Sequence, residues 1–132
     1  MMSDLIISEY RDFIENLISM HIEARLEIVA SKEEMDGKLG RAIWGGDKMT
    51  PIIQLPRQIT AQEIDDSLLA LAVRGHISEN QELICHAEEI DSPLEYLKHL
   101  VLHEVAHIKN NWYQDREIDC DLWVYGQMHK GR

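Results

Sequence analysis

One stretch of the chain, residues 92–108, constrains its fold more than any other. It begins with Ser92, a preferred N-cap, followed by Pro93 at the first helical position and Glu95 three residues after the cap. No glycine or proline then occurs up to Ile108, and apolar residues fall on nearly every side of the predicted helix. Because a helix that is apolar all round is normally buried, we expect the rest of the chain to pack around it.

This predicted helix contains the pattern H-E-x-x-H, formed by His103, Glu104 and His107. Residues four apart share a helical face, so the two imidazoles can bind one metal ion. Glu104 is turned by about 100° around the axis, which places it beside the ion and not among its ligands. Zinc lowers the pKa of a bound water towards ~7, and a neighbouring carboxylate can accept its proton. We interpret the pattern as a zinc site with Glu104 as general base; the alternative is two ordinary core histidines.

A catalytic zinc site needs a third protein ligand, and the next predicted helix offers carboxylates for that position. Two asparagines after residue 109 favour a helix end and a tight turn, and a further helix is predicted from near Asp115. Glu117 and Asp121 are four residues apart and share one face of it. The alternative is a solvated face in an acidic chain. The inward stripe of this helix is predicted to be Ile118, Leu122 and Tyr125.

H-E-x-x-H followed by a helix with E-x-x-x-D resembles the gluzincin metallopeptidases, whose distant relatives include thermolysin. The resemblance covers about residues 94–125. It implies that His103, His107 and Glu117 bind zinc, that Glu104 is the general base, and that Asp121 orients His103. The small size is most similar to the minimal gluzincins and the ImmA/IrrE-type peptidases. It implies an α+β, zincin-like fold, mostly helical with a small sheet or hairpin.

The sequence departs from that family in its spacing. Ten positions separate His107 from Glu117, fewer than the family usually shows, so the two helices must turn back sharply. Asn110 and Tyr113 stand where metzincins carry a glycine and a third histidine, which excludes that class. Because of the short spacing, the rivals of Glu117 for the third ligand are Asp115, Asp119 and Asp121.

Composition narrows the class of protein. The 132 residues suffice for one domain, expected to cover 1–132. The net charge of −11, with no visible basic patch, argues against a nucleic-acid partner. Two cysteines without C-x-x-C spacing favour a reducing, cytoplasmic setting. The first residues show neither a signal peptide nor a membrane span. The expected partner is a peptide or protein substrate.

The other predicted elements precede the central helix. Pro51 and Pro56 cannot donate ladder hydrogen bonds, so the strand containing them is expected near a sheet edge. Such an edge can bind an extended peptide by β-augmentation, although an ordinary hairpin over the core explains the pattern equally well. In order, we expect an amphipathic helix over 3–31 and a hairpin of 40–44 and 49–55 joined by 45–47. A helix is predicted to begin at Thr60, with Glu63 completing its capping box, and to end at Gly75. A further helix is expected over 78–90.

Two functions fit these observations. The first is a zinc-dependent metallopeptidase, and the second is a catalytically silent zincin-like regulatory or binding protein with a structural zinc. A structural zinc site has no need of a glutamate at position 104, which favours the enzyme. His99, four residues before His103, is either a fourth ligand or a wall of the site. The side chains able to stabilise an oxyanion are Tyr113, Tyr125, His86 and His129.

Overall fold

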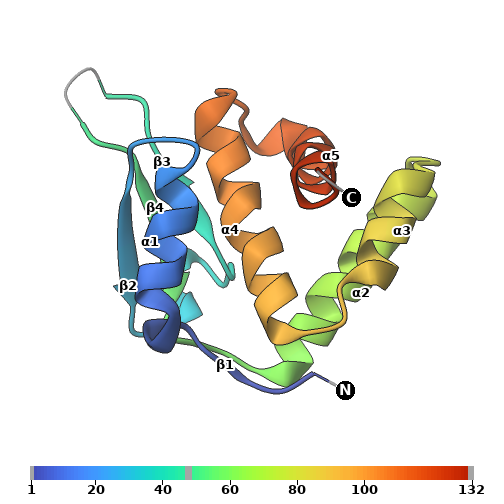
Figure 1. Ribbon diagram of the computed structural model, residues 1–132, viewed down its shortest axis with the longest axis horizontal. Helices are drawn as coiled ribbons and strands as arrows, with labels where there is room; N and C mark the ends of the chain where they lie inside the picture. The colour runs from blue at the N-terminus through green and yellow to red at the C-terminus, as the bar shows by residue number, and fades with distance from the viewer. Residues whose placement is uncertain (1, 47–48, 131–132) are drawn as a thin grey trace.

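One buried helix, α4 (Pro93–Lys109), runs through the middle of the fold (Figure 1). The structure is a computed structural model that describes residues 2–46 and 49–130. As predicted, Ser92 caps α4, with its Oγ accepting a hydrogen bond of 3.1 Å from the backbone N–H of Glu95. All residues from His99 to His107 are buried, which confirms that the helix lies in the core.

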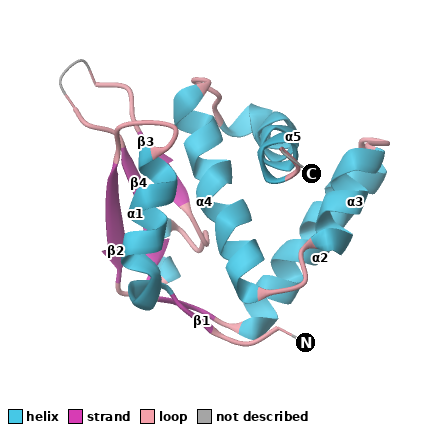
Figure 2. Cartoon of the chain, in the orientation of Figure 1, coloured by secondary structure: helices cyan, strands magenta, loops and turns pink. Residues whose placement is uncertain are grey.

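The chain is an α+β protein in which far more residues are helical than lie in strands (Figure 2). Besides α4, the helices of the described ranges are α1 (Arg11–Ser19), α2 (Ala61–Ile77), α3 (Gln81–Glu89) and α5 (Glu117–Met128), with short 3-10 turns at Ile7–Tyr10, Lys32–Met35 and Gln114–Arg116. The strands are β1 (Leu5–Ile6), β2 (Arg25–Val29), β3 (Arg41–Ile43), β4 (Ile52–Pro56) and β5 (Gln58–Ile59). None of the described helices has the length and apolar character needed to cross a bilayer.

The larger sheet has the order β2-β4-β3, with β2 parallel and β3 antiparallel to β4. The predicted hairpin is confirmed as β3 and β4; residue 47 of its connection lies outside the described ranges. The expectation that the proline-flanked strand lies at an edge is wrong, because β4 is central. Pro51 precedes the strand and its carbonyl accepts a bond of 2.8 Å from Arg25 N–H, while Pro56 is its last residue. Neither proline therefore removes a hydrogen bond from the strand interior.

The prediction of one helix over residues 3–31 is wrong. The segment instead forms β1, a 3-10 turn, α1 and then β2. Helix α1 stops at Ser19, whose hydroxyl donates back to the carbonyl of Asn16 at 2.9 Å. The apolar residues of the second half pair in register with β4, with Leu26 opposite Ile53. This long-range strand pairing overrides the helical spacing of the apolar residues.

Helices α2 and α3 form an antiparallel pair beside α4 (Figure 1). The predicted capping box of α2 is confirmed, but the helix continues through Gly75 to Ile77. Gly75 serves packing, because a Cβ there would lie 2.9 Å from Ile84 Cγ1 on α3. The predicted helix over 78–90 is confirmed but begins at Gln81, since Ser78 caps the end of α2.

Helix α5 closes the fold against α4 and α3. A helix begins near Asp115 as predicted, first as a 3-10 turn and then as α5. Its predicted inward stripe is only partly correct, because Ile118 and Leu122 pack at the margin of the core and Tyr125 is half-buried. The most deeply buried residues of α5 are instead Cys120, Asp121 and Val124.

Candidate metal centre

A sharp turn brings the end of α4 back against the start of α5. Asn110 is the C-cap of α4, and Asn111 takes a left-handed conformation with φ of 54°, which asparagine tolerates well. The Trp112 N–H then donates to the carbonyl of His107 at 2.9 Å. The short spacing between His107 and Glu117 therefore does not prevent the two residues from meeting, because Glu117 stands at the first turn of α5 beside the last turn of α4.

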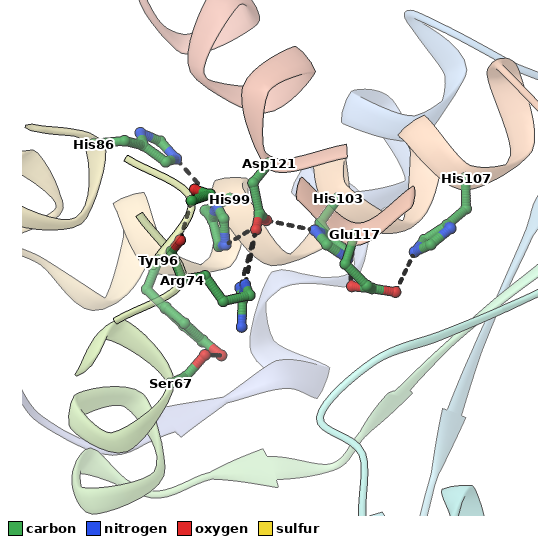
Figure 3. A network of polar contacts seen from close by, with 10 residues as sticks. Ser67, Arg74, His86, Tyr96, His99, His103, His107, Glu117 and Asp121 are labelled. Atoms are coloured by element: carbon green, nitrogen blue, oxygen red, sulfur yellow. Dashed lines mark hydrogen bonds and ion pairs between the residues drawn. The ribbon is translucent and has the colours of Figure 1, made fainter. Parts of the chain in front are cut away.

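Three predicted ligands converge at this corner. The Glu117 carboxylate lies between the two imidazoles of α4, with Oε2 2.7 Å from His103 Nε2 and Oε1 3.0 Å from His107 Nε2 (Figure 3). Both histidines are buried, whereas the Glu117 side chain is 41% exposed. Two imidazole nitrogens and one carboxylate, reachable from solvent on the carboxylate side, form a donor set that suits a catalytic metal ion with an open position.

The second nitrogen of each imidazole is also engaged. His103 Nδ1 lies 2.8 Å from Asp121 Oδ1, and His107 Nδ1 lies 2.7 Å from the carbonyl oxygen of Trp112. Since a carboxylate and a carbonyl only accept, each Nδ1 donates and each Nε2 faces Glu117. Partners of this kind fix the tautomer and orientation of metal-binding histidines. Asp121 thus stands where the sequence predicts it, behind His103.

Asp121 is itself held by a residue that the sequence analysis missed. Arg74 of α2 donates to Asp121 Oδ2 from both Nε, at 3.3 Å, and Nη2, at 3.0 Å. The Asp121 side chain is fully buried, so this guanidinium compensates a charge that burial alone would disfavour. Arg74 lies far from α5 in the chain, and no local pattern marks it.

The rivals for the third ligand lie elsewhere. Asp115 is exposed, and Asp119 pairs with Arg116 at 2.5 Å. Asp121 is occupied by His103 Nδ1 and Arg74. Of the four predicted carboxylates, Glu117 is the one placed between the Nε2 atoms.

Cys120 is a donor that the sequence analysis did not consider. With His103 and His107 it forms a buried cluster whose potential ligand atoms lie within 4.8 Å of one another, so a metal ion could be held there. Burial raises the pKa of the Cys120 thiol to about 12, with the nearby acidic residues acting in the same direction. Because a thiol must ionise to bind a metal, Glu117 is the better donor. Cys120 follows Glu117 by three positions, so helical spacing alone would have revealed it.

Charges at this corner reinforce one another. Burial lowers the pKa of His103, but its hydrogen bonds to Asp121 and Glu117 outweigh burial and raise that pKa to about 10. The pKa of His107 is raised in the same way by Glu117 and the Trp112 carbonyl. The pKa of Glu117 is lowered, because its bonds to the two histidines outweigh burial. The corner therefore attracts positive charge, which a divalent ion would supply.

Glu104 is buried next to these ligands but is not among them. Burial raises the pKa of its carboxyl group. A Cβ placed on Gly40, just before β3, would lie 3.0 Å from Glu104 Oε2. The carboxylate therefore reaches the backbone at the start of the edge strand β3. Gly40 is a third residue of the site, after Arg74 and Cys120, that local sequence patterns did not assign to it; the pattern placed Gly40 only in a hairpin.

His99 is not a fourth member of the donor set. Its Nε2 lies 3.9 Å from Asp121 Oδ1, and its Nδ1 lies 3.0 Å from Nε2 of His86 (Figure 3). Burial lowers the pKa of His99 to about 3. His99, His103 and Asp121 have ligand atoms within 4.8 Å, but a cation among them would meet the guanidinium of Arg74. The sequence alternative that His99 forms a wall behind the site matches its position.

The four predicted oxyanion donors divide into two groups. Tyr113 stacks on Trp44 with ring centroids 5.1 Å apart, and Trp44 in turn lies 6.2 Å from the ring of His107. The other three, Tyr125, His86 and His129, contact one another on the side of His99. Tyr113 is therefore the member of the set that lies on the His107 side of the candidate centre.

Comparisons with protein-family models, with curated proteins and with solved structures gave no match. The case for a metal centre therefore rests on the donor atoms themselves. Two imidazole nitrogens and a carboxylate meet at one corner, each imidazole is oriented by a second acceptor, and a buried glutamate lies beside them.

Proposed function

We propose that this chain is a zinc-dependent metallopeptidase of gluzincin type with a zincin-like fold. The observation that carries the proposal is the meeting of His103 Nε2, His107 Nε2 and the Glu117 carboxylate, with Asp121 behind His103. This arrangement supports the ligand set and the orienting aspartate that the sequence resemblance implies. A silent binding protein needs only the ligands, whereas the placement of Glu104 beside them supports catalysis.

The proposed reaction is hydrolysis of a peptide bond. Zinc held by His103, His107 and Glu117 would lower the pKa of a bound water and polarise the substrate carbonyl. Glu104 accepts the proton of the attacking water and then donates it to the departing amine nitrogen. Asp121 and the Trp112 carbonyl hold the two imidazoles in place throughout. Tyr113, beside Trp44, is the proposed hydrogen-bond donor to the carbonyl oxygen as negative charge grows on it.

The edge strand β3 supports an extended peptide as the substrate. Within residues 2–46 and 49–130, β3 pairs with β4 along one side only, which leaves its other side for a substrate strand. Gly40 places the start of this strand against Glu104, so a peptide added to β3 would pass the general base. The sequence analysis expected a peptide to add to the proline-flanked strand; because that strand, β4, is central, the proposed binding edge is β3 instead. The net charge of −11 favours cationic peptides.

Glu104→Gln tests the chemistry separately from metal binding. We expect about one zinc per chain in both wild type and variant, measured by mass spectrometry on protein purified without chelators or a histidine tag. Cleavage of labelled casein and of a mixed fluorogenic peptide library should fall by at least about 100-fold in the variant, because the general base is lost. Glu88→Gln, an exposed change on α3, is the matched control and should retain full activity.

The possible outcomes separate the two functions. Undiminished cleavage by Glu104→Gln would overturn the mechanism. Tightly held zinc in a wild type that cleaves no member of the library would support the structural-zinc alternative. A wild type that binds no zinc, even when zinc is added, would overturn both.

A further inference from the structure

A groove with an apolar lining lies between α1, α4 and α5, outside the candidate metal centre. Its volume is about 950 Å³, at the upper end of the range for small-molecule pockets and enough for several side chains. We call it the α1/α4/α5 groove. Its apolar lining residues are Phe13, Leu17, Met20, Leu102, Trp123 and Met128.

The charge of this groove differs from that of the chain as a whole. Lys98, Lys109 and Lys130 line it, against one acidic residue, Glu95. The chain carries 24 acidic and only 13 basic residues, so three lysines at one apolar groove are a local reversal of sign. An apolar surface with acidic neighbours would be complementary to it.

Helix α2 presents a surface of that description. Leu69, Val73 and Ile77 recur every four residues along its outer side and are 65%, 45% and 79% exposed. Asp65 and Asp66, both exposed, stand at the N-terminal end of this row. We call these five residues the α2 stripe. A contiguous row of large exposed apolar side chains is typical of an interaction site, and amphipathic helices bind grooves through apolar residues spaced three and four apart.

The stripe and the groove of one molecule cannot meet. Helix α2 packs against α3 on one side of α4, whereas α1 lies on the other (Figure 1).

We propose that the α2 stripe of one copy docks in the α1/α4/α5 groove of a second copy. The partner is thus this chain itself, held by apolar burial and by aspartate–lysine attraction. Because the two surfaces are unlike and lie on opposite sides of α4, the contact is heterologous, and the dimer is its smallest assembly. This inference does not depend on the proposed peptidase activity.

Sedimentation equilibrium across a wide range of protein concentration tests the contact. We expect wild type to form a reversible dimer that weakens as salt rises, because the aspartate and lysine charges are screened. Leu69→Glu/Val73→Glu in the stripe and Lys98→Glu/Lys130→Glu in the groove should each raise the dimer Kd by at least about tenfold. Met49→Glu is the matched control, since Met49 is 46% exposed and lies outside both surfaces; it should dimerise like wild type.

Mixing the two double variants gives a sharper result. Each variant alone lacks one half of every contact and should be monomeric. The stripe variant keeps an intact groove and the groove variant keeps an intact stripe, so the mixture should form a one-to-one complex. Circular dichroism and the thermal transition of each variant show whether it is folded, and formation of the mixed complex shows that each intact surface still binds.

Three outcomes would overturn the proposal. One is a wild type that remains monomeric at the highest concentration. Another is a dimer that only one of the two double variants disrupts, which would assign the contact to a different pair of surfaces. The third is a monomer whose groove binds a synthetic acidic amphipathic helix unrelated to α2, which would assign the groove to another protein.

Discussion

Two histidines one turn apart on α4 have opposite electrostatic properties. His99 and His103 are both buried, at 6% and 8% exposure, and both face Asp121. Burial lowers the pKa of His99 to about 3. For His103 the hydrogen bonds outweigh burial, and the pKa rises to about 10.

Distance to carboxylates explains the difference. His103 bonds Asp121 at 2.8 Å and Glu117 at 2.7 Å, whereas His99 lies 3.9 Å from Asp121 and bonds the imidazole of His86. A buried imidazolium persists only where anions contact it directly. The same helix therefore offers one position that attracts cations, at His103, and one that disfavours them, at His99, so a metal ion would be held more readily at His103.

The largest expected effect comes from removing Glu117, because its carboxylate contacts His103 and not His99 and is therefore one cause of the difference between the two histidines. In Glu117→Ala, zinc affinity should fall by more than about 100-fold, beyond the usual loss for a supporting residue. Competition with a chromogenic chelator measures it. Asp119→Ala on the same helix is the control and should bind like wild type. Retained zinc in Glu117→Ala together with loss in Cys120→Ala would make Cys120 the third ligand.

The stability of the protein at acid pH tests whether the buried imidazoles around His99 are neutral, because His86, which bonds His99, titrates in an accessible range. Burial lowers the pKa of His86 from 6.5 to about 4; Asp121 and Glu89 oppose this, and His129 adds to it. A lowered folded-state pKa means that the contribution to stability is present above pH 6.5 and is lost as pH falls towards 4. At about 1.4 kcal/mol per pKa unit, wild type should lose up to about 3 kcal/mol more than His86→Gln across this window.

Urea unfolding of both proteins at several pH values measures that difference. Glutamine at position 86 can still donate to His99 Nδ1 but does not titrate, so it preserves the hydrogen bond. Equal losses of stability in wild type and variant would show that His86 is not buried as a neutral group.

Asp121→Asn should produce a smaller effect on the His103 side. The amide retains an acceptor for His103 Nδ1 but loses the charge that supports this imidazole. Zinc affinity should fall by about 10–100-fold, the usual cost of losing an orienting carboxylate. The chelator competition applies again, with Asp119→Asn as the matched change. An unaltered affinity would separate Asp121 from the metal centre.

Arg74→Met should have the smallest effect, because Arg74 acts on the metal only through Asp121. We expect at most about a tenfold loss of zinc affinity, accompanied by lower stability from the unpaired buried carboxylate. The zinc affinity of the double variant Arg74→Met/Asp121→Asn should be close to that of Asp121→Asn alone. Arg74 acts on the metal through the Asp121 carboxylate, and this carboxylate is already absent in Asp121→Asn. Additive losses would show that Arg74 acts independently of Asp121.

Local signals predicted several elements well. The caps of α2 and α4 depend on neighbouring residues, and both begin where Thr60 and Ser92 indicate. The spacing of His103 and His107 likewise places them on one face from sequence alone. Glu117 and Asp121 share the next helix, and they reach opposite nitrogens of His103 as the resemblance implies.

Errors arose where a distant segment decides the conformation. Residues 25–29 have helix-like spacing but pair with β4. Gly75 resembles a helix end, but it is where α3 approaches α2. The proline-flanked strand resembles an edge, but β2 covers its second side.

The sequence by itself determined the capped central helix, the histidine pair and the carboxylates that follow it, because helical geometry fixes neighbours within a few residues. The tertiary structure alone decided that Glu117 lies between the Nε2 atoms, that Arg74 holds Asp121, and that Gly40 meets Glu104. It also decided the different pKa values of His99 and His103. These properties depend on distances between segments far apart in the chain, and electrostatic interactions change with every ångström of those distances.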